Sequence, residues 1–126
     1  MSKVIYKRWK GLQTDSREQA RIAIGKERIH ISSKIDLPEQ KEEVSYNLML
    51  HHDWTLLEFR IWGTNLVEQV FTYAQSATRF VNFDITPLTK ALPINYLKFH
   101  HKTSLEDKIL LIQYPSLHHA FHEQSY

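Results

Sequence analysis

The chain has 126 residues, 42% of them hydrophobic and 24% charged, which is enough for one domain with a single core. Sixteen basic against fourteen acidic residues give a net charge of only +2, and the basic residues are scattered along the chain. This pattern predicts no nucleic-acid partner. The sequence contains no cysteine, which excludes disulfides, thiolate catalysis and cysteine-ligated zinc.

No linker, repeat or low-complexity segment interrupts the chain, so we predict a single domain over residues 1–126. The first ten residues carry charges where a signal peptide needs an apolar core. No later stretch approaches the roughly 18 apolar residues of a membrane span. We therefore expect a cytoplasmic protein without an integral membrane segment.

Apolar and polar residues alternate in the first part of the chain, as in strands with one buried face. A strand before residue 25 and another after residue 28 are joined by Gly25-Lys26, which predicts a tight hairpin turn. The predicted buried residues of these two strands are Ala20, Ile22 and Ile24, and Ile29, Ile31, Ser33 and Ile35.

A polar, proline-broken loop over 37–43 leads to the next pair of strands. Their connection is predicted at His51-His52-Asp53, with the second strand starting at Trp54 and stopping at 63–65. The predicted inward residues are Val44, Tyr46, Leu48 and Leu50 in the first strand, and Leu57, Phe59 and Ile61 in the second, opposite Glu58, Arg60 and Trp62. This order indicates a meander of antiparallel strands.

Residues 66–73 and 79–85 repeat the alternation more weakly. A helix over 65–77 is the alternative for the first of them, because Asn65 and Glu68 have the spacing of a capping box. Its β-branched and aromatic residues favour a strand. Residues 84–97 contain two prolines in an apolar run, which predicts a rigid, extended, partly buried connector.

The chain closes with a segment over 96–100, a polar turn at 101–104, an apolar run over 108–114 and a last strand from Leu117 to Tyr126. Taken with the earlier strands, this pattern predicts an all-β, mainly antiparallel fold. We expect a curved sheet rolled on itself, with at most a short helix.

Three groups of residues form a pattern along the chain. The first, in order and spacing, is Asp84, Thr86, Pro87, Thr89, Leu92, Pro93, Ile94 and Leu97. The others are Tyr46-Asn47-Leu48 with His52-Asp53-Trp54, and Tyr114-Pro115-Ser116-Leu117 with Gln124-Ser125-Tyr126; Trp9 and Gly11 add to them near the start. Together they resemble a glycolipid-binding family with a spiral β-roll fold. The chain looks like a shortened member, lacking a stretch between Trp54 and Asp84.

The resemblance implies non-covalent binding of a lipid or glycolipid-like amphiphile, with no cofactor. A site of this kind is mostly apolar, with a few polar groups for the head group and aromatic faces for sugar rings. The candidate ligand-binding residues are Trp9, Tyr46, Trp54, Phe59, Trp62, Asp84, Thr86, Thr89 and Lys90. Two alternatives stay open: the aromatic residues form the core, and the two threonines hydrogen-bond the backbone of a turn.

Two functions of other classes are also open. Long strands leave sheet edges that could pair with a second copy, which would give a homodimer or an interaction module. A small enzyme could use Asp53 beside His52, or Asp84 near Ser76, but no nucleophile elbow, phosphate loop or paired-carboxylate motif is visible. We therefore expect no catalytic residues.

Eight histidines raise the question of a metal site. They include the pairs His51-His52 and His100-His101, and His118, His119 and His122 near the end. In a strand, His118 and His122 share a face while His119 points to the other. No Asp or Cys stands at a ligand spacing, so we predict that they bind no metal.

Overall fold

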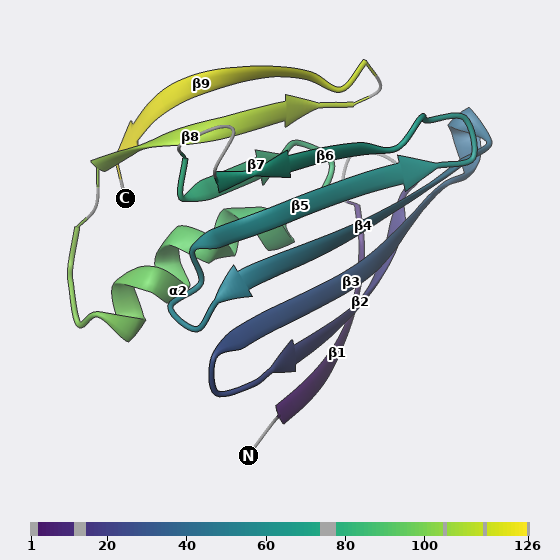
Figure 1. Cartoon of the computed structure of the whole chain (residues 1–126). Coiled ribbons are helices and arrows are strands. Elements are labelled where there is room, and N and C mark those ends of the chain that lie inside the picture. The colour runs from purple at the N-terminus through teal and green to yellow at the C-terminus, as the bar shows by residue number, and fades with distance from the viewer. Residues whose placement is uncertain (1–2, 12–14, 74–77, 105, 115, 126) are drawn as a thin grey trace.

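The computed structural model describes residues 3–11, 15–73, 78–104, 106–114 and 116–125, and within them it contains two β-sheets (Figure 1). The larger sheet is formed by β1 (Lys3–Lys10), β2 (Arg17–Ile24), β3 (Arg28–Leu37), β4 (Glu42–His51), β5 (Leu56–Gly63) and β6 (Gln69–Thr72). The smaller sheet is formed by β7 (Phe80–Phe83), β8 (Glu106–Gln113) and β9 (His118–Ser125).

In the larger sheet every strand pairs antiparallel with the next strand along the chain. The hairpin at Gly25 is confirmed, since its N–H donates to the carbonyl oxygen of Arg28 at 2.9 Å. A 3₁₀ turn, η1 (Pro38–Gln40), with Lys41 at φ 50°, makes the predicted loop between β3 and β4. The inward residues predicted for β2, β3 and β4 are buried, except that Ile24 is only half-buried.

The β4–β5 hairpin differs from the prediction in two ways. Trp54 lies in the turn with φ 75°, and β5 begins only at Leu56. Leu50 pairs with Leu56, whereas its neighbour in β4 pairs with Glu58, so Leu57 is the extra residue of a β-bulge. A bulge shifts the alternation by one residue, and Leu56 takes the buried position that the sequence predicted for Leu57.

The smaller sheet is not a continuation of the meander, because β7 and β8 are parallel. Parallel neighbours need a crossover, and this one contains the 3₁₀ turn η2 (Leu88–Ala91) and the helix α2 (Leu92–Phe99). The backbone N–H of Leu56 donates to the carbonyl of Arg79 at 2.7 Å. This bond ties the start of β5 to the residue before β7, and the two sheets share one core.

The extended connector predicted over 84–97 is therefore wrong. Pro93 stands in the first turn of α2, where its missing N–H needs no partner. Leu92 adopts helical angles (φ −60°, ψ −48°) although a residue before proline is biased against them. Leu92, Tyr96 and Leu97 are all buried, and packing this helical face on the core outweighs the local bias.

The main predictions of fold class are confirmed: the described chain is mostly antiparallel strand, with one short helix and an open, curved main sheet. β6 shows that residues 69–72 form a strand rather than part of a helix, while residues 74–77 lie outside the described residues. In the described part of the chain, no helix is long and apolar enough to cross a membrane.

Candidate functional site: a cavity between the sheets

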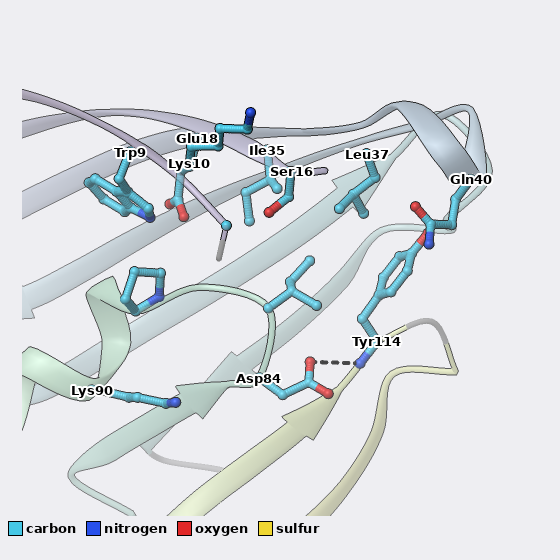
Figure 2. Close-up of a pocket in the computed structure, with 13 residues that line it drawn as sticks. Trp9, Lys10, Ser16, Glu18, Ile35, Leu37, Gln40, Asp84, Lys90 and Tyr114 are labelled. Carbon is cyan, nitrogen blue, oxygen red and sulfur yellow. Dashed lines mark hydrogen bonds between the residues drawn. The ribbon is translucent and has the colours of Figure 1, made fainter. Parts of the chain in front are cut away.

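A cavity of about 750 Å³ opens where the ends of β1, β2 and β3 face the segment that follows β7 (Figure 2). Its apolar wall is formed by Trp9, Ile35, Leu37, Ile85, Pro87 and Tyr114. Its polar lining is formed by Lys10, Ser16, Glu18, Gln40, Asp84 and Lys90, together with Gly11. Figure 2 shows Trp9, Glu18, Ile35 and Leu37 on one side, facing Asp84 and Tyr114 on the other.

Glu18 lines this cavity but is only 3% exposed, and its carboxylate accepts hydrogen bonds from three hydroxyls. Its Oε2 accepts hydrogen bonds from the hydroxyls of Ser33 and Tyr46, each at 2.5 Å. Its Oε1 accepts from the hydroxyl of Thr86 at 2.6 Å. The carboxylate thereby joins three neighbouring strands of the large sheet to the segment after β7.

Burial raises the pKa of Glu18 above its ordinary value of 4.5, although hydrogen bonds from Ser33, Thr86 and Tyr46 each favour the charged form. Burial, followed by the neighbouring charge of Glu18, raises the pKa of Tyr46 well above 10.0. Tyr46 therefore keeps its proton at neutral pH and acts as a donor to the carboxylate.

Trp9 stands directly opposite Glu18 in the β1–β2 register. Its indole Nε1 is buried and has no hydrogen-bond partner in the part of the chain that the structure describes. The N–H nevertheless lies close enough to Glu18 to favour the charged form of that carboxyl and so act to lower its pKa, and Figure 2 shows the ring nitrogen beside the carboxylate. The N–H thus faces the Glu18 carboxylate without meeting it at hydrogen-bond geometry, and because an unpaired buried donor costs free energy, an acceptor that enters the cavity would gain by pairing with it.

Side chains of the segment over 84–90 accept hydrogen bonds from backbone N–H groups and so hold the segment in place. Asp84 Oδ1 accepts from the backbone N–H of Tyr114 at 3.0 Å. Thr86 Oγ1 accepts from the N–H of Leu88 at 3.1 Å, and Thr89 Oγ1 accepts from the N–H of Phe83 at 3.0 Å. The backbone role predicted for the two threonine hydroxyls is present, and both residues are 1% exposed, behind the cavity wall.

The charged rim is more open than this wall. Lys10, Asp84 and Lys90 are exposed where they border the cavity. Neither lysine forms an ion pair with any residue that the structure describes. Their ammonium groups can therefore turn toward a ligand without breaking an ion pair with a described residue.

The predicted ligand-binding residues are only partly brought together. Trp9, Asp84 and Lys90 line the cavity, while Tyr46 and Thr86 contact Glu18 from behind it. The other candidates lie elsewhere: Phe59 and Thr89 are buried, Trp54 is in the β4–β5 turn and Trp62 lines a groove on the opposite face of the sheet. The aromatic residues thus do not form a common lining.

Sequence reasoning missed Glu18, although a signal was present. Glu18 has the same parity in β2 as Ala20 and Ile22, so the alternation that predicts their burial also places a carboxylate inside. Tyr114 was noted only in the pattern that resembles the glycolipid-binding family. No feature of the neighbouring sequence predicts that its side chain reaches the cavity. Burial and, second, the charge of Glu42 raise the pKa of its phenol.

Glu42 is a second inward carboxylate, 4% exposed, with the parity of Val44. Its Oε2 accepts from the backbone N–H and side-chain amide of Asn65 at 3.1 and 2.7 Å. A Cβ on Gly63 would lie 2.6 Å from Glu42 Oε1, so only glycine leaves room for this bond pattern. Glu42 therefore fixes the chain after β5.

Asp53 pairs with His100 rather than with His52, at 3.2 Å between Oδ2 and Nε2. Burial raises the pKa of Asp53, but hydrogen bonds from Thr55 and His100 outweigh it and the pKa lies below 3.8. The imidazole of His52 instead packs on Phe99, 5.2 Å between ring centres. The pair does not line the cavity, and Ser76, the other predicted partner for an acid, lies outside the described residues.

The histidines raised the question of a metal site. Among the residues that the structure describes, no three His, Asp or Glu side chains are placed to hold a metal ion. The side chains of His118, His119 and His122 lie outside what the structure describes.

Fold and cavity together define an all-β protein of two sheets with a side cavity that joins an apolar wall to a charged rim. No protein-family model and no curated protein matches the chain. Among solved structures, the chain is similar to the crystal structure of a DUF1089 family protein from Pseudomonas aeruginosa. The two share 17% identity over 94% of this chain and 73% of that chain, with a TM-score of 0.56. At this identity the likeness shows the fold alone.

Proposed function

We propose that the protein binds an amphiphile of lipid or glycolipid type in the cavity between the sheets, without chemistry. The observation that carries the proposal is the combination of an apolar wall with an unpaired, buried Trp9 N–H and a charged rim. Ligand sites commonly join such a wall to a few polar groups that orient the ligand. In the cytoplasm, where we place the protein, the ligand would enter from water.

The cavity suggests how such a ligand would be oriented. Ile35, Leu37 and Ile85 offer contact for an acyl or alkyl chain. The hydroxyls of an uncharged head group would accept from Trp9 Nε1 and Lys90 and donate to Asp84. Because Glu18 already accepts three hydroxyl donors, we assign it the support of the site rather than contact with the ligand.

Calorimetric titration with dodecyl maltoside below its micelle concentration tests the proposal. Ile85 is half-buried in the wall, so Ile85→Trp fills the cavity and is expected to abolish binding. Ile94→Trp is the matched control, since Ile94 is 48% exposed on α2 and does not line the cavity. Equal binding by both variants, or native mass spectra that recover only unliganded protein from a lipid extract, would reject the proposal.

The alternatives have less support. The edge strand β1 carries Lys3, Lys7, Arg8 and Lys10, and pairing two copies through it would bring these charges together. This repulsion disfavours a homodimer that pairs through β1. For an enzyme, the Asp53–His100 pair is partly exposed and lines neither the cavity between the sheets nor the groove on the opposite face of the large sheet.

A further inference from the structure

The opposite face of the large sheet holds a second concave site, a groove of about 490 Å³ that crosses β1 to β5. Two rows of side chains, set by the strand register, run across it. One row contains Tyr6, Arg21, Ser32 and Asn47. The next row contains Arg8, Gln19, Lys34, Ser45 and Trp62. Each residue in these rows points away from the core, because the buried residues have the opposite parity.

The groove is positively charged and its charge is poorly compensated. Arg8, Arg21 and Lys34 line it, and no acidic side chain is among its described lining residues. Lys34 has one exposed ion pair, with Glu43 at 3.6 Å, whereas the two arginines have none within the described chain. Farther along the same face, Arg60 is balanced by Glu58 and Glu68. Arg8 and Arg21, and likewise Arg21 and Lys34, are diagonal neighbours on adjacent strands, so the register gathers their positive charge in one patch that can attract an anionic ligand.

The other side chains of the groove suit a sugar. Trp62 stands at one end of its row, and Tyr6, 73% exposed, stands at the opposite end of the other. Trp62 is half-buried and Tyr6 is exposed, and the accessible faces of such large aromatic rings are platforms for the apolar faces of sugar rings. Between them lie small uncharged polar side chains, Ser32, Ser45 and Asn47, whose hydrogen-bonding groups have no partner in the described part of the chain. Their hydroxyl and amide groups can both donate and accept.

We propose that this groove binds an acidic oligosaccharide, whose carboxylates pair with Arg8 and Arg21 while its rings lie against Trp62 and Tyr6. A single-stranded nucleic acid is the rival, since it also uses aromatic platforms in a positive groove. Its affinity, however, comes mainly from many phosphate contacts. Four cationic residues line the groove, but Lys7 has the parity of the inward face, opposite Ala20. The three outward cations, Arg8, Arg21 and Lys34, lie among several uncharged polar groups and fit a ligand with few charges and many hydroxyls better. The site is separate from the cavity and does not depend on the proposed amphiphile binding.

Binding of a galacturonic acid oligomer to the full chain, by calorimetry at low salt, tests this inference. Arg21→Gln is expected to weaken binding about tenfold or more, which corresponds to about 1.4 kcal/mol. Arg28→Gln is the matched control: it removes the same charge from an exposed position on the same face, but Arg28 does not line the groove. Trp62→Ala is expected to weaken binding as well, and a neutral maltose oligomer is expected to bind at least tenfold more weakly. The unfolding transitions of all three variants show whether they are folded.

Each other outcome overturns the inference. Equal weakening by Arg21→Gln and Arg28→Gln would mean attraction to overall charge rather than a site. Tighter binding of an oligo-deoxythymidylate, lost in the same groove variants, would assign the groove to nucleic acid. No heat and no fluorescence change at millimolar oligomer would mean that the groove does not bind acidic sugars.

Discussion

The two faces of the six-stranded sheet carry the same alternation but opposite chemistry. The inner face holds its polar groups in a closed network, in which Glu18 accepts from three hydroxyls and sits at 3% exposure. The outer face leaves Arg8 and Arg21 without described partners in a shallow groove. The inner side chains thus stabilise the fold and shape a cavity, whereas the outer ones cost little to change and are available for binding.

The largest difference in unfolding free energy between variants of the two faces is expected in β5. Phe59 and Trp62 of this strand were both candidates for ligand binding. Phe59 is fully buried and packs on Tyr46 and Phe83, with ring centres 5.6 and 5.8 Å away. Phe59→Ala should lower the free energy of unfolding by about 3–5 kcal/mol. Trp62→Ala should lower it by about 1 kcal/mol or less. Urea unfolding of both variants measures the difference, and similar losses would contradict the assignment of Phe59 to the core.

A smaller difference in unfolding free energy between inward and outward variants is expected in β4. Tyr46→Phe removes one of the three donors to the buried Glu18 carboxylate and should cost about 1–3 kcal/mol of unfolding free energy. The neighbouring Asn47 points outward, and Asn47→Ala should change the unfolding free energy by about 0.5 kcal/mol or less. If thermal unfolding shows Tyr46→Phe to be as mild as Asn47→Ala, the network does not hold the sheet to the segment after β7.

The pH dependence of stability sharpens the same contrast. Because the pKa of Glu18 is raised in the folded state, its contribution is fully present below 4.5 and is lost as pH rises through the folded pKa. The unfolding free energy of the natural chain minus that of Glu18→Gln should therefore fall as pH rises from 4.5 toward neutrality. Asp53 has a lowered pKa, so its contribution to stability changes with pH in the opposite direction. Both proteins contain Asp53, and its contribution therefore cancels in the difference. A difference that rises with pH would contradict the account of Glu18.

The smallest effect is expected at the surface pair. His100→Ala removes one hydrogen-bond donor to the Asp53 carboxylate. The pKa of Asp53 is lowered, so its contribution is present above 3.8 and lost as pH falls through its folded pKa. Solvent and salt screen this pair, and the loss of unfolding free energy at neutral pH should be about 0.2–1 kcal/mol. Urea unfolding at low and high salt measures it. A loss as large as that of Tyr46→Phe would mean that the pair belongs to a buried network.

Much of the larger sheet was predictable, because period-two alternation from Ala20 to Ile61 reports which face is buried. The bulge at Leu57 was not, since one inserted residue leaves no local mark. The segment over 84–97 was mispredicted for a physical reason. Local proline preferences favour extended backbone, whereas the buried face of α2 forms only once Leu92 and Tyr96 meet the core.

The candidate site was harder to predict than the sheet. Its lining comes from segments as far apart as Trp9, Ile35, Asp84 and Tyr114, and the crossover to a parallel β8 decides which of them meet. Trp9, Asp84 and Lys90 were among the predicted candidates through the family resemblance, and Glu18 could have been found from the alternation of β2. The outer groove was hidden for a similar reason: basic residues that look scattered along the chain become neighbours only through the register of β1, β2 and β3.

The most direct test of amphiphile binding uses two single-tryptophan proteins. Trp54→Phe with Trp62→Phe leaves Trp9 in the cavity, and Trp9→Phe with Trp54→Phe leaves Trp62 in the outer groove. Both are titrated with dodecyl maltoside below its micelle concentration while tryptophan emission is recorded. The account predicts a saturable blue shift for the Trp9 protein and no shift for the Trp62 protein. No shift from Trp9, or equal shifts from both, would contradict it.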